Sequence, residues 1–176
     1  MLRIILPVLL SFAMLGCSAK PVTDFAVAHD FSQYKTFAFV APSQGAVASI
    51  DSSRIESAVA TQLNKKGVNQ TEFRSADLLV DYHIDSATEL EPYGGSVGVG
   101  MGIFHRGSIG ISTPPRYRER KYGKLVLEFS NPKSKSIIWR SVSQRRLTET
   151  MSAEKRANFI MEEIALMLKN YPPQAK

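Results

Sequence analysis

Cysteine is almost absent from this sequence, since Cys17 is the only one in 176 residues. A single thiol cannot close an intramolecular disulfide, so the fold has to be stable through packing alone. Long hydrophobic runs are also missing. The longest apolar stretch, residues 4–15, has 12 residues, whereas a helix that crosses a bilayer needs about 20. The composition, 44% hydrophobic and 22% charged, excludes a disordered chain of low hydrophobicity.

The apolar stretch lies at the N-terminus and has the features of a secretory leader. Arg3 precedes the stretch and the small residue Gly16 follows it, as in leaders that a peptidase removes. We therefore predict an exported protein with a leader at residues 1–16. The simpler alternative is a plain leader cleaved near Ala19, in which Cys17 is discarded.

The end of the leader, Met14-Leu15-Gly16-Cys17, resembles the bacterial lipobox, although Met14 and Leu15 are less common choices at their positions. A cysteine thiolate is a soft nucleophile that can take a diacylglyceryl group as a thioether, and two or three acyl chains anchor a protein stably. The resemblance implies palmitate-bearing lipid at Cys17. Because Ser18 rather than aspartate follows, it also implies the outer membrane, with the domain in the periplasm.

The patterns after residue 24 predict one α+β domain, residues 25–176, behind a lipidated tether at residues 17–24. Each expected helix carries one apolar stripe, so both helices should cover one face of a sheet. We expect a two-layer sandwich with a mainly antiparallel four-stranded sheet. The strands are expected at 34–40, 76–85, 124–129 and 137–147, and the helices at 50–67 and 152–170.

Several local signals mark where these elements end. Ser53 and Glu56 have capping-box spacing, and Gly67 is a typical helix stop. Ser152 is the expected cap of the second helix. The segment "NPKSKS" should turn the last two strands into an antiparallel hairpin, with Trp139 as a core anchor.

The motifs "DFSQYKTFAF", "ADLLVDYHI", "IIWRS" and "LKNYPP", with a Gly-rich segment between them, resemble the bacterial lipoproteins of domain of unknown function 4136. The resemblance extends from about residue 24 to residue 173. It implies an envelope lipoprotein and transfers no active site.

The Gly-rich segment, residues 93–113, allows four interpretations. Residues 94–98 match G-x-S-x-G around Ser96. A hydrolase elbow requires a strand before this motif and a helix after it, and the sequence lacks both signals. The segment is not a phosphate-binding loop of the dinucleotide type, because Ile103 stands where that motif requires its last glycine. The two remaining alternatives are a flexible loop and a β-hairpin with Val97, Val99, Met101 and Ile103 on one apolar face, a surface for a partner.

Two charged clusters are further candidates. Asp81, His83 and Asp85 alternate along one strand, but they span about 13 Å, too far to bind one ion together, so a solvated strand face is the simpler interpretation. The segment "RYRERKYGK" has five cations. Three of them, Arg116, Arg118 and Arg120, can contact anionic lipid headgroups, or they can remain solvated surface charge on a hairpin leg.

The sequence thus predicts a non-enzymatic lipoprotein of the outer membrane that binds an envelope protein or anionic lipid. It predicts no cofactor and no metal, and export argues against nucleic acid as a partner despite the net charge of +6. It defines no oligomeric state. The alternative is a small envelope hydrolase that uses Ser96 or the Asp81, His83, Asp85 face.

Overall fold

The computed structural model describes residues 19–40, 49–93, 99–100, 110–111 and 116–173. The described helical elements are η2 (Phe31–Gln33), α2 (Ile50–Lys65), η3 (Phe73–Ser75) and α3 (Ala153–Met167). The described strands are β1 (Val22–Phe25), β2 (Thr36–Phe39), β3 (Asn69–Gln70), β4 (Leu78–Tyr93), β5 (Val99–Gly100), β6 (Gly110–Ile111), β7 (Arg116–Asn131) and β8 (Ser136–Val142).

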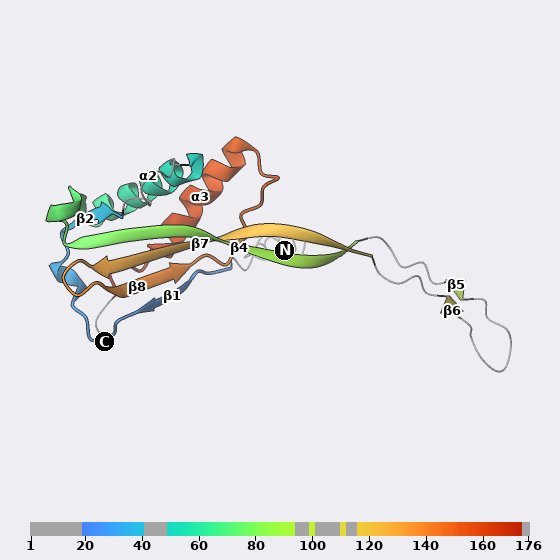
Figure 1. Ribbon diagram of the computed structural model, residues 1–176, viewed down its shortest axis with the longest axis horizontal. Helices are drawn as coiled ribbons and strands as arrows, with labels where there is room; N and C mark the ends of the chain where they lie inside the picture. Colours follow the sequence, from blue (N-terminus) through green and yellow to red (C-terminus); the bar gives the residue numbers. More distant parts are fainter. Residues whose placement is uncertain (1–18, 41–48, 94–98, 101–109, 112–115, 174–176) are drawn as a thin grey trace, which may run out of the picture.

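The main sheet has six strands in the order β1-β8-β7-β4-β2-β3, with α2 and α3 on one face (Figure 1). The protein is α+β, but the expected four-stranded, mainly antiparallel sheet is wrong. β2 pairs in parallel with both β3 and β4. In the sequence, α2 follows β2 and precedes these two strands, and a helical crossover returns the chain in the same direction. Residues 22–24, expected in the tether, belong to β1, which pairs antiparallel with β8.

The hairpin of β7 and β8 is confirmed. Its turn is held by the Asn131 side chain, whose oxygen accepts hydrogen bonds from the backbone N–H groups of Lys133 and Ser134. Lys135 takes the left-handed backbone conformation, with φ 55°, which closes the turn tightly.

The two α-helices are capped by serines. Ser152 caps α3 as predicted, but the cap of α2 is Ser49 rather than Ser53, since the Ser49 hydroxyl accepts the N–H of Ser52. The expected end of α2 is confirmed: the helix stops at Lys65, and Gly67 has φ 79°, a conformation that glycine adopts without strain. Among the described residues, no helix is long and apolar enough to cross a bilayer.

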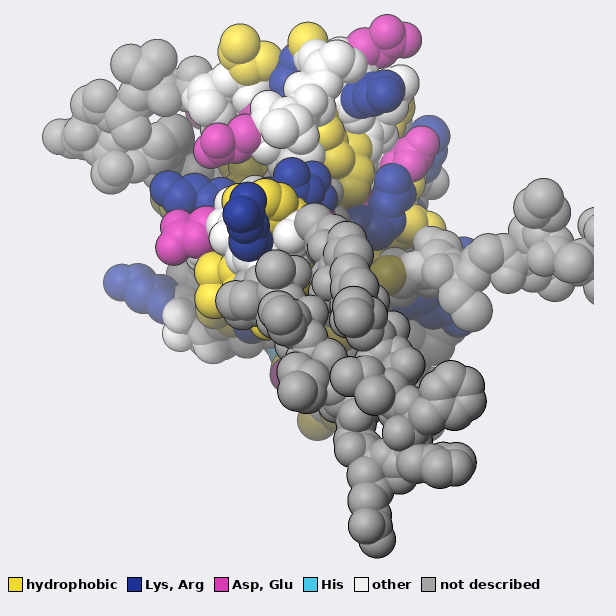
Figure 2. All heavy atoms as spheres, turned by 90° about the vertical axis from the view of Figure 1, so that its right-hand side faces the viewer, with side chains coloured by type: hydrophobic (Ala, Val, Ile, Leu, Met, Phe, Trp, Pro, Cys, Tyr) yellow, Lys and Arg dark blue, Asp and Glu magenta, His cyan; other side chains and the backbone are white. Residues whose placement is uncertain are grey.

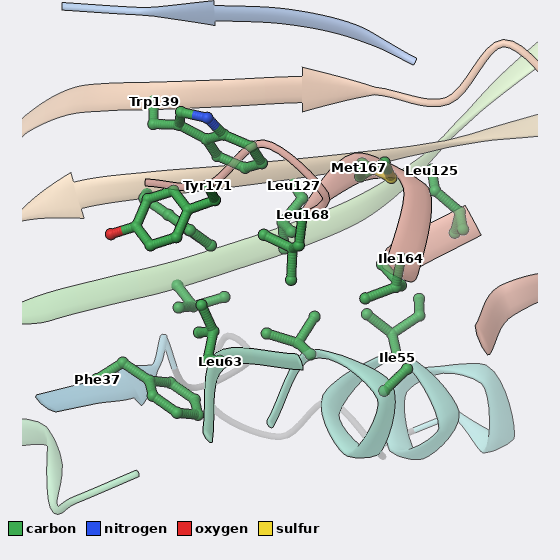
Figure 3. Close-up of a cluster of buried hydrophobic side chains, with 14 of the residues drawn as sticks. Phe37, Ile55, Leu63, Leu125, Leu127, Trp139, Ile164, Met167, Leu168 and Tyr171 are labelled. Carbon is green, nitrogen blue, oxygen red and sulfur yellow. The ribbon is translucent and has the colours of Figure 1, made fainter. Parts of the chain in front are cut away.

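The core lies between the helices and the sheet, and Figure 3 shows its centre. Phe37 of β2 and Ile55 and Leu63 of α2 close one side. On the other side, Trp139 stacks on Phe129 with ring centroids 4.5 Å apart. The edge of the Tyr171 ring, which follows α3, packs against Trp139 at 5.6 Å. Trp139 is buried, so its expected role as a core anchor is confirmed.

Candidate functional site

β4 and β7 continue beyond the rest of the sheet as a projecting two-stranded ribbon (Figure 1). Their pairing runs without interruption to Tyr93↔Arg116. In contrast, β2 accompanies β4 only as far as Val80, and the last residue of β8, Val142, lies beside Val126 of β7. We define the ribbon as residues 88–93 paired with residues 116–121. At about 3.4 Å per residue, it reaches about 20 Å beyond its base.

The base of the ribbon requires a glycine. A methyl group at Gly123 would overlap Cγ2 of Ile84 on the neighbouring strand. The backbone of Gly123 also exchanges two hydrogen bonds with Leu147, at 2.7 and 2.9 Å. The segment after β8 therefore clamps the ribbon at the point where it leaves the domain.

One face of the ribbon carries the three predicted arginines, two of which are ion-paired. Arg118 donates to Glu91 through Nε and Nη2, at 3.1 and 2.9 Å, and Arg120 Nε lies 3.4 Å from the same carboxylate. The hydrogen bond from Arg118 holds the pKa of Glu91 below its ordinary value. The arginine charges are thus partly neutralised within the ribbon.

A second ion pair lies at the base of this face. Arg146 Nη1 lies 2.5 Å from Glu89 Oε2, and its guanidinium lies 4.7 Å above the ring of Tyr122. Among the described side chains visible in Figure 2, Lys and Arg are interspersed with Asp and Glu. The charges on this face are therefore mixed in sign.

The opposite face of the ribbon carries three apolar residues, Leu90, Pro92 and Tyr117, beside the charged Glu119 and Lys121. Pro92 lies opposite Tyr117 and Leu90 lies two residues away on the same face, because alternate residues of a strand share a face. Leu90 is 61% exposed and Tyr117 is 58% exposed. These exposed apolar side chains make this face a candidate contact surface.

Most of the predicted apolar arm lies outside the described residues, as do Cys17 and Ser96. This applies to Val97, Met101 and Ile103. Val99 is the exception: its backbone pairs antiparallel with Ile111, and Gly100 pairs with Gly110. The hairpin alternative predicts this pairing.

The Asp81, His83 and Asp85 face of β4 is solvated. His83 Nε2 lies 3.3 Å from Asp85 Oδ1, with both side chains about half exposed. Asp81 lies opposite Glu128, whose carboxylate pairs with Arg140 at 2.8 Å. No group of three metal-binding side chains occurs among the residues that the structure describes.

Two ionisable side chains were not singled out from the sequence as ionisable groups: Tyr82, which is half-buried, and Glu163, which is fully buried. Tyr82 donates to Glu56 Oε1 at 2.5 Å, and burial together with this hydrogen bond raises the pKa of Tyr82 to about 12. Glu163 of α3 is fully buried, and burial raises its pKa. Its position three residues after Ile160 and one before Ile164 places it on the buried stripe, so helical spacing alone would have found it.

The chain belongs to the family described as domain of unknown function (DUF4136), whose profile matches residues 21–173. No curated protein matches the chain.

The chain is similar to two solved structures. A PDZ domain protein from Parabacteroides distasonis superimposes with a TM-score of 0.59 at 16% identity, over 90% of this chain and 36% of that one. This chain therefore spans little more than a third of that protein. A PelC dodecamer from Paraburkholderia phytofirmans has a TM-score of 0.46 at 11% identity, over 84% of this chain and 94% of that one. At such identities the likeness concerns the fold alone.

Proposed function

We propose that the protein is a lipoprotein, anchored through Cys17 in the outer membrane, whose periplasmic domain binds an envelope protein through the ribbon. The leader sequence and the lipobox ending at Cys17 support the anchor. The family match begins at residue 21, so the family domain starts directly behind the proposed lipid attachment site.

The observation that carries the partner-binding role is the exposure of Leu90 and Tyr117 on a ribbon that projects from the domain. An isolated two-stranded hairpin is marginally stable in water, and its unpaired strand edges can accept a further strand. A partner that covers the apolar face of Leu90, Pro92 and Tyr117 removes this surface from water. The ion-paired arginines on the other face then form a polar border to the contact.

Site-specific cross-linking in intact cells tests this role. A photoreactive residue placed at Leu90 or Tyr117 should give a discrete cross-linked product. Ile137 on the domain body is a matched control, since it is an apolar β-strand residue with a similar exposure of 56%. Equal products at all three positions, or none at the ribbon, would contradict the proposal.

Membrane fractionation tests the anchor separately. Cys17→Ala should release the protein from the membrane fraction, because the thioether can no longer form. Ser18→Ala is the matched control, since it changes the neighbouring residue and leaves the thiol in place. Cys17→Ala protein that stays in the membrane with unchanged yield would refute lipid anchoring.

A further inference from the structure

A hollow of about 1050 Å³ opens at the β1 side of the sheet, beside the C-terminal end of α3. Such a volume is at the upper end of the range for sites that hold a small molecule. It arises because β1 extends the sheet past the two helices, which leaves part of the core face uncovered. Its described lining includes Lys20, Phe25, Lys66, Trp139, Met167, Lys169 and Tyr171.

The charged groups of the hollow have one sign. Lys20, Lys66 and Lys169 line it, and the described lining contains no acidic residue. The Lys66 ammonium donates one hydrogen bond, at 3.4 Å, to the carbonyl of Lys169. An ammonium has three donors, so this contact leaves Lys66 able to bind an anion. The hollow therefore has only cationic charges, whereas in the ribbon Glu91 and Glu89 lie beside the arginines.

Besides the lysines, the lining is mainly aromatic and aliphatic, with Thr23 and Asn170 as neutral polar members. Trp139 and Met167 are buried, Phe25 is half-buried, and the rings of Trp139 and Tyr171 are packed edge to face. A cationic rim around an apolar interior matches a ligand that has both an anionic group and a hydrocarbon part. The phosphate of a phospholipid headgroup, with the glycerol and upper acyl carbons behind it, is such a ligand.

The position of the hollow in the chain supports the same ligand. Lys20 on its rim is three residues from Cys17, and three residues span at most about 11 Å. A lipid on Cys17 would therefore hold the rim of the hollow close to the bilayer surface. At that distance, lysines interact strongly with anionic headgroups.

We propose that the hollow binds the phosphorylated headgroup of an anionic phospholipid in the membrane that holds the anchor. This inference rests on the proposed function for the location of the hollow at a membrane. Lys20, Lys66 and Lys169 contact the phosphate, and the apolar interior takes the first carbons of the lipid. The headgroup contact orients the domain, so that the bound face lies on the membrane.

Energy transfer from Trp139 provides the test, because it is the only tryptophan of the chain. The full protein, extracted into an uncharged detergent, is mixed with phosphatidylethanolamine that carries a dansyl group on its head. Unlabelled phosphatidylglycerol and unlabelled phosphatidylcholine then compete at the same mole fraction. Phosphatidylglycerol should abolish the transfer, and phosphatidylcholine should leave most of it.

Two triple variants separate the hollow from general charge. Each lysine near an anionic surface is worth about a fivefold change in affinity, so Lys20→Gln, Lys66→Gln and Lys169→Gln together should weaken phosphatidylglycerol binding about 100-fold. The matched control replaces three lysines outside the described lining, at positions 35, 65 and 155, and should change affinity less than about twofold. Equal losses in both variants would refute a defined site.

The remaining outcomes identify other occupants, and each overturns the proposal. Competition by phosphatidylcholine as strong as that by phosphatidylglycerol would show an apolar lipid site without headgroup recognition. Competition by inorganic phosphate at the same concentration would show a site for free phosphate. Repeating the titration with Cys17→Ser separates the two proposals: lysine-dependent binding that persists there supports the hollow, even if fractionation refutes the anchor.

Discussion

Replacing Arg145 by glutamine should destabilise the protein strongly at neutral pH and little in acid. Arg145 Nη1 donates to Glu162 Oε2 at 3.1 Å and lies 3.2 Å from Oε1 of the buried Glu163. The Glu163 oxygens have no hydrogen-bond partner among the described residues, so the ion pair is their main compensation for lost water. Removing one partner of a buried pair costs 3–5 kcal/mol. Since Arg145 is 34% exposed, water screens the pair, and we expect about 2 kcal/mol.

The pH dependence follows from the direction of the Glu163 pKa. Burial raises this pKa above the ordinary value of 4.5, and Arg145 opposes the increase. A carboxyl whose pKa is higher in the folded protein stabilises the fold below its unfolded pKa, and this stabilisation is lost as the pH rises through the folded pKa. The Arg145→Gln penalty should therefore be small near pH 4, where Glu163 is protonated, and should grow towards neutral pH.

Urea denaturation at about pH 4 and about pH 7.5 measures this difference. At the higher pH the melting temperature should also fall, by about 4–8 °C for 2 kcal/mol. Glu163→Gln in the Arg145→Gln background should recover most of the loss. Arg140→Gln, which removes an exposed partner of Glu128, is the control and should cost less than about 1 kcal/mol. An Arg145→Gln penalty that is equal at both pH values would refute the reasoning.

Two further predictions concern the base of the ribbon and the contact between the helices. Gly123→Ala should lower the free energy of unfolding by about 1–3 kcal/mol in urea denaturation, because the new methyl group overlaps Ile84 Cγ2. Recovery of stability when Ile84→Ala is added would confirm the overlap. An unchanged urea midpoint for the single variant would contradict it. Asp51→Asn should cost about 1 kcal/mol at neutral pH, and the cost should shrink as the pH falls below the ordinary Asp pKa of 3.8. Burial raises the pKa of Asp51, but hydrogen bonds from Arg156 and Arg54 lower it by more, so that the pKa is below its ordinary value. The stabilisation from such a carboxyl is present above its unfolded pKa and is lost as the pH falls through its folded pKa. If Asp51→Asn loses as much stability on acidification as the unmodified protein, Asp51 is not the source of this stabilisation.

The elements that sequence reasoning predicted are those with strong side-chain periodicity. The stripes of α2 and α3 and the alternation from Leu78 to Ile84 depend on burial, and burial imposes a regular spacing. β1 and β3 were missed because they are short and contain polar residues such as Asp24 and Asn69. Their pairing comes from a neighbouring strand rather than from their own apolar pattern.

The parallel pairing of β2 with β4 was within reach of the sequence. A strand, a helix and a second strand in succession form a crossover unit, which places the two strands parallel when they are neighbours. The order predicted from residues 34–85 has this form. The expectation of an antiparallel sheet gave too much weight to the hairpin of β7 and β8.

The ribbon itself was harder to predict. The alternation of β4 weakens after Asp85, and residues 116–121 are mostly charged, so neither segment has a strong strand pattern. Their pairing depends on contacts between strands, such as Arg118 with Glu91, which require the register. The charge of the segment identified Arg116, Arg118 and Arg120 as candidates, but the carboxylate that pairs with two of them could not be identified from the sequence.

Mass spectrometry of the N-terminal peptide of the protein purified from membranes tests the central claim most directly. We expect a mature chain that begins at Cys17 and carries a diacylglyceryl group with a further acyl chain. An unmodified chain that begins after residue 17 would contradict it.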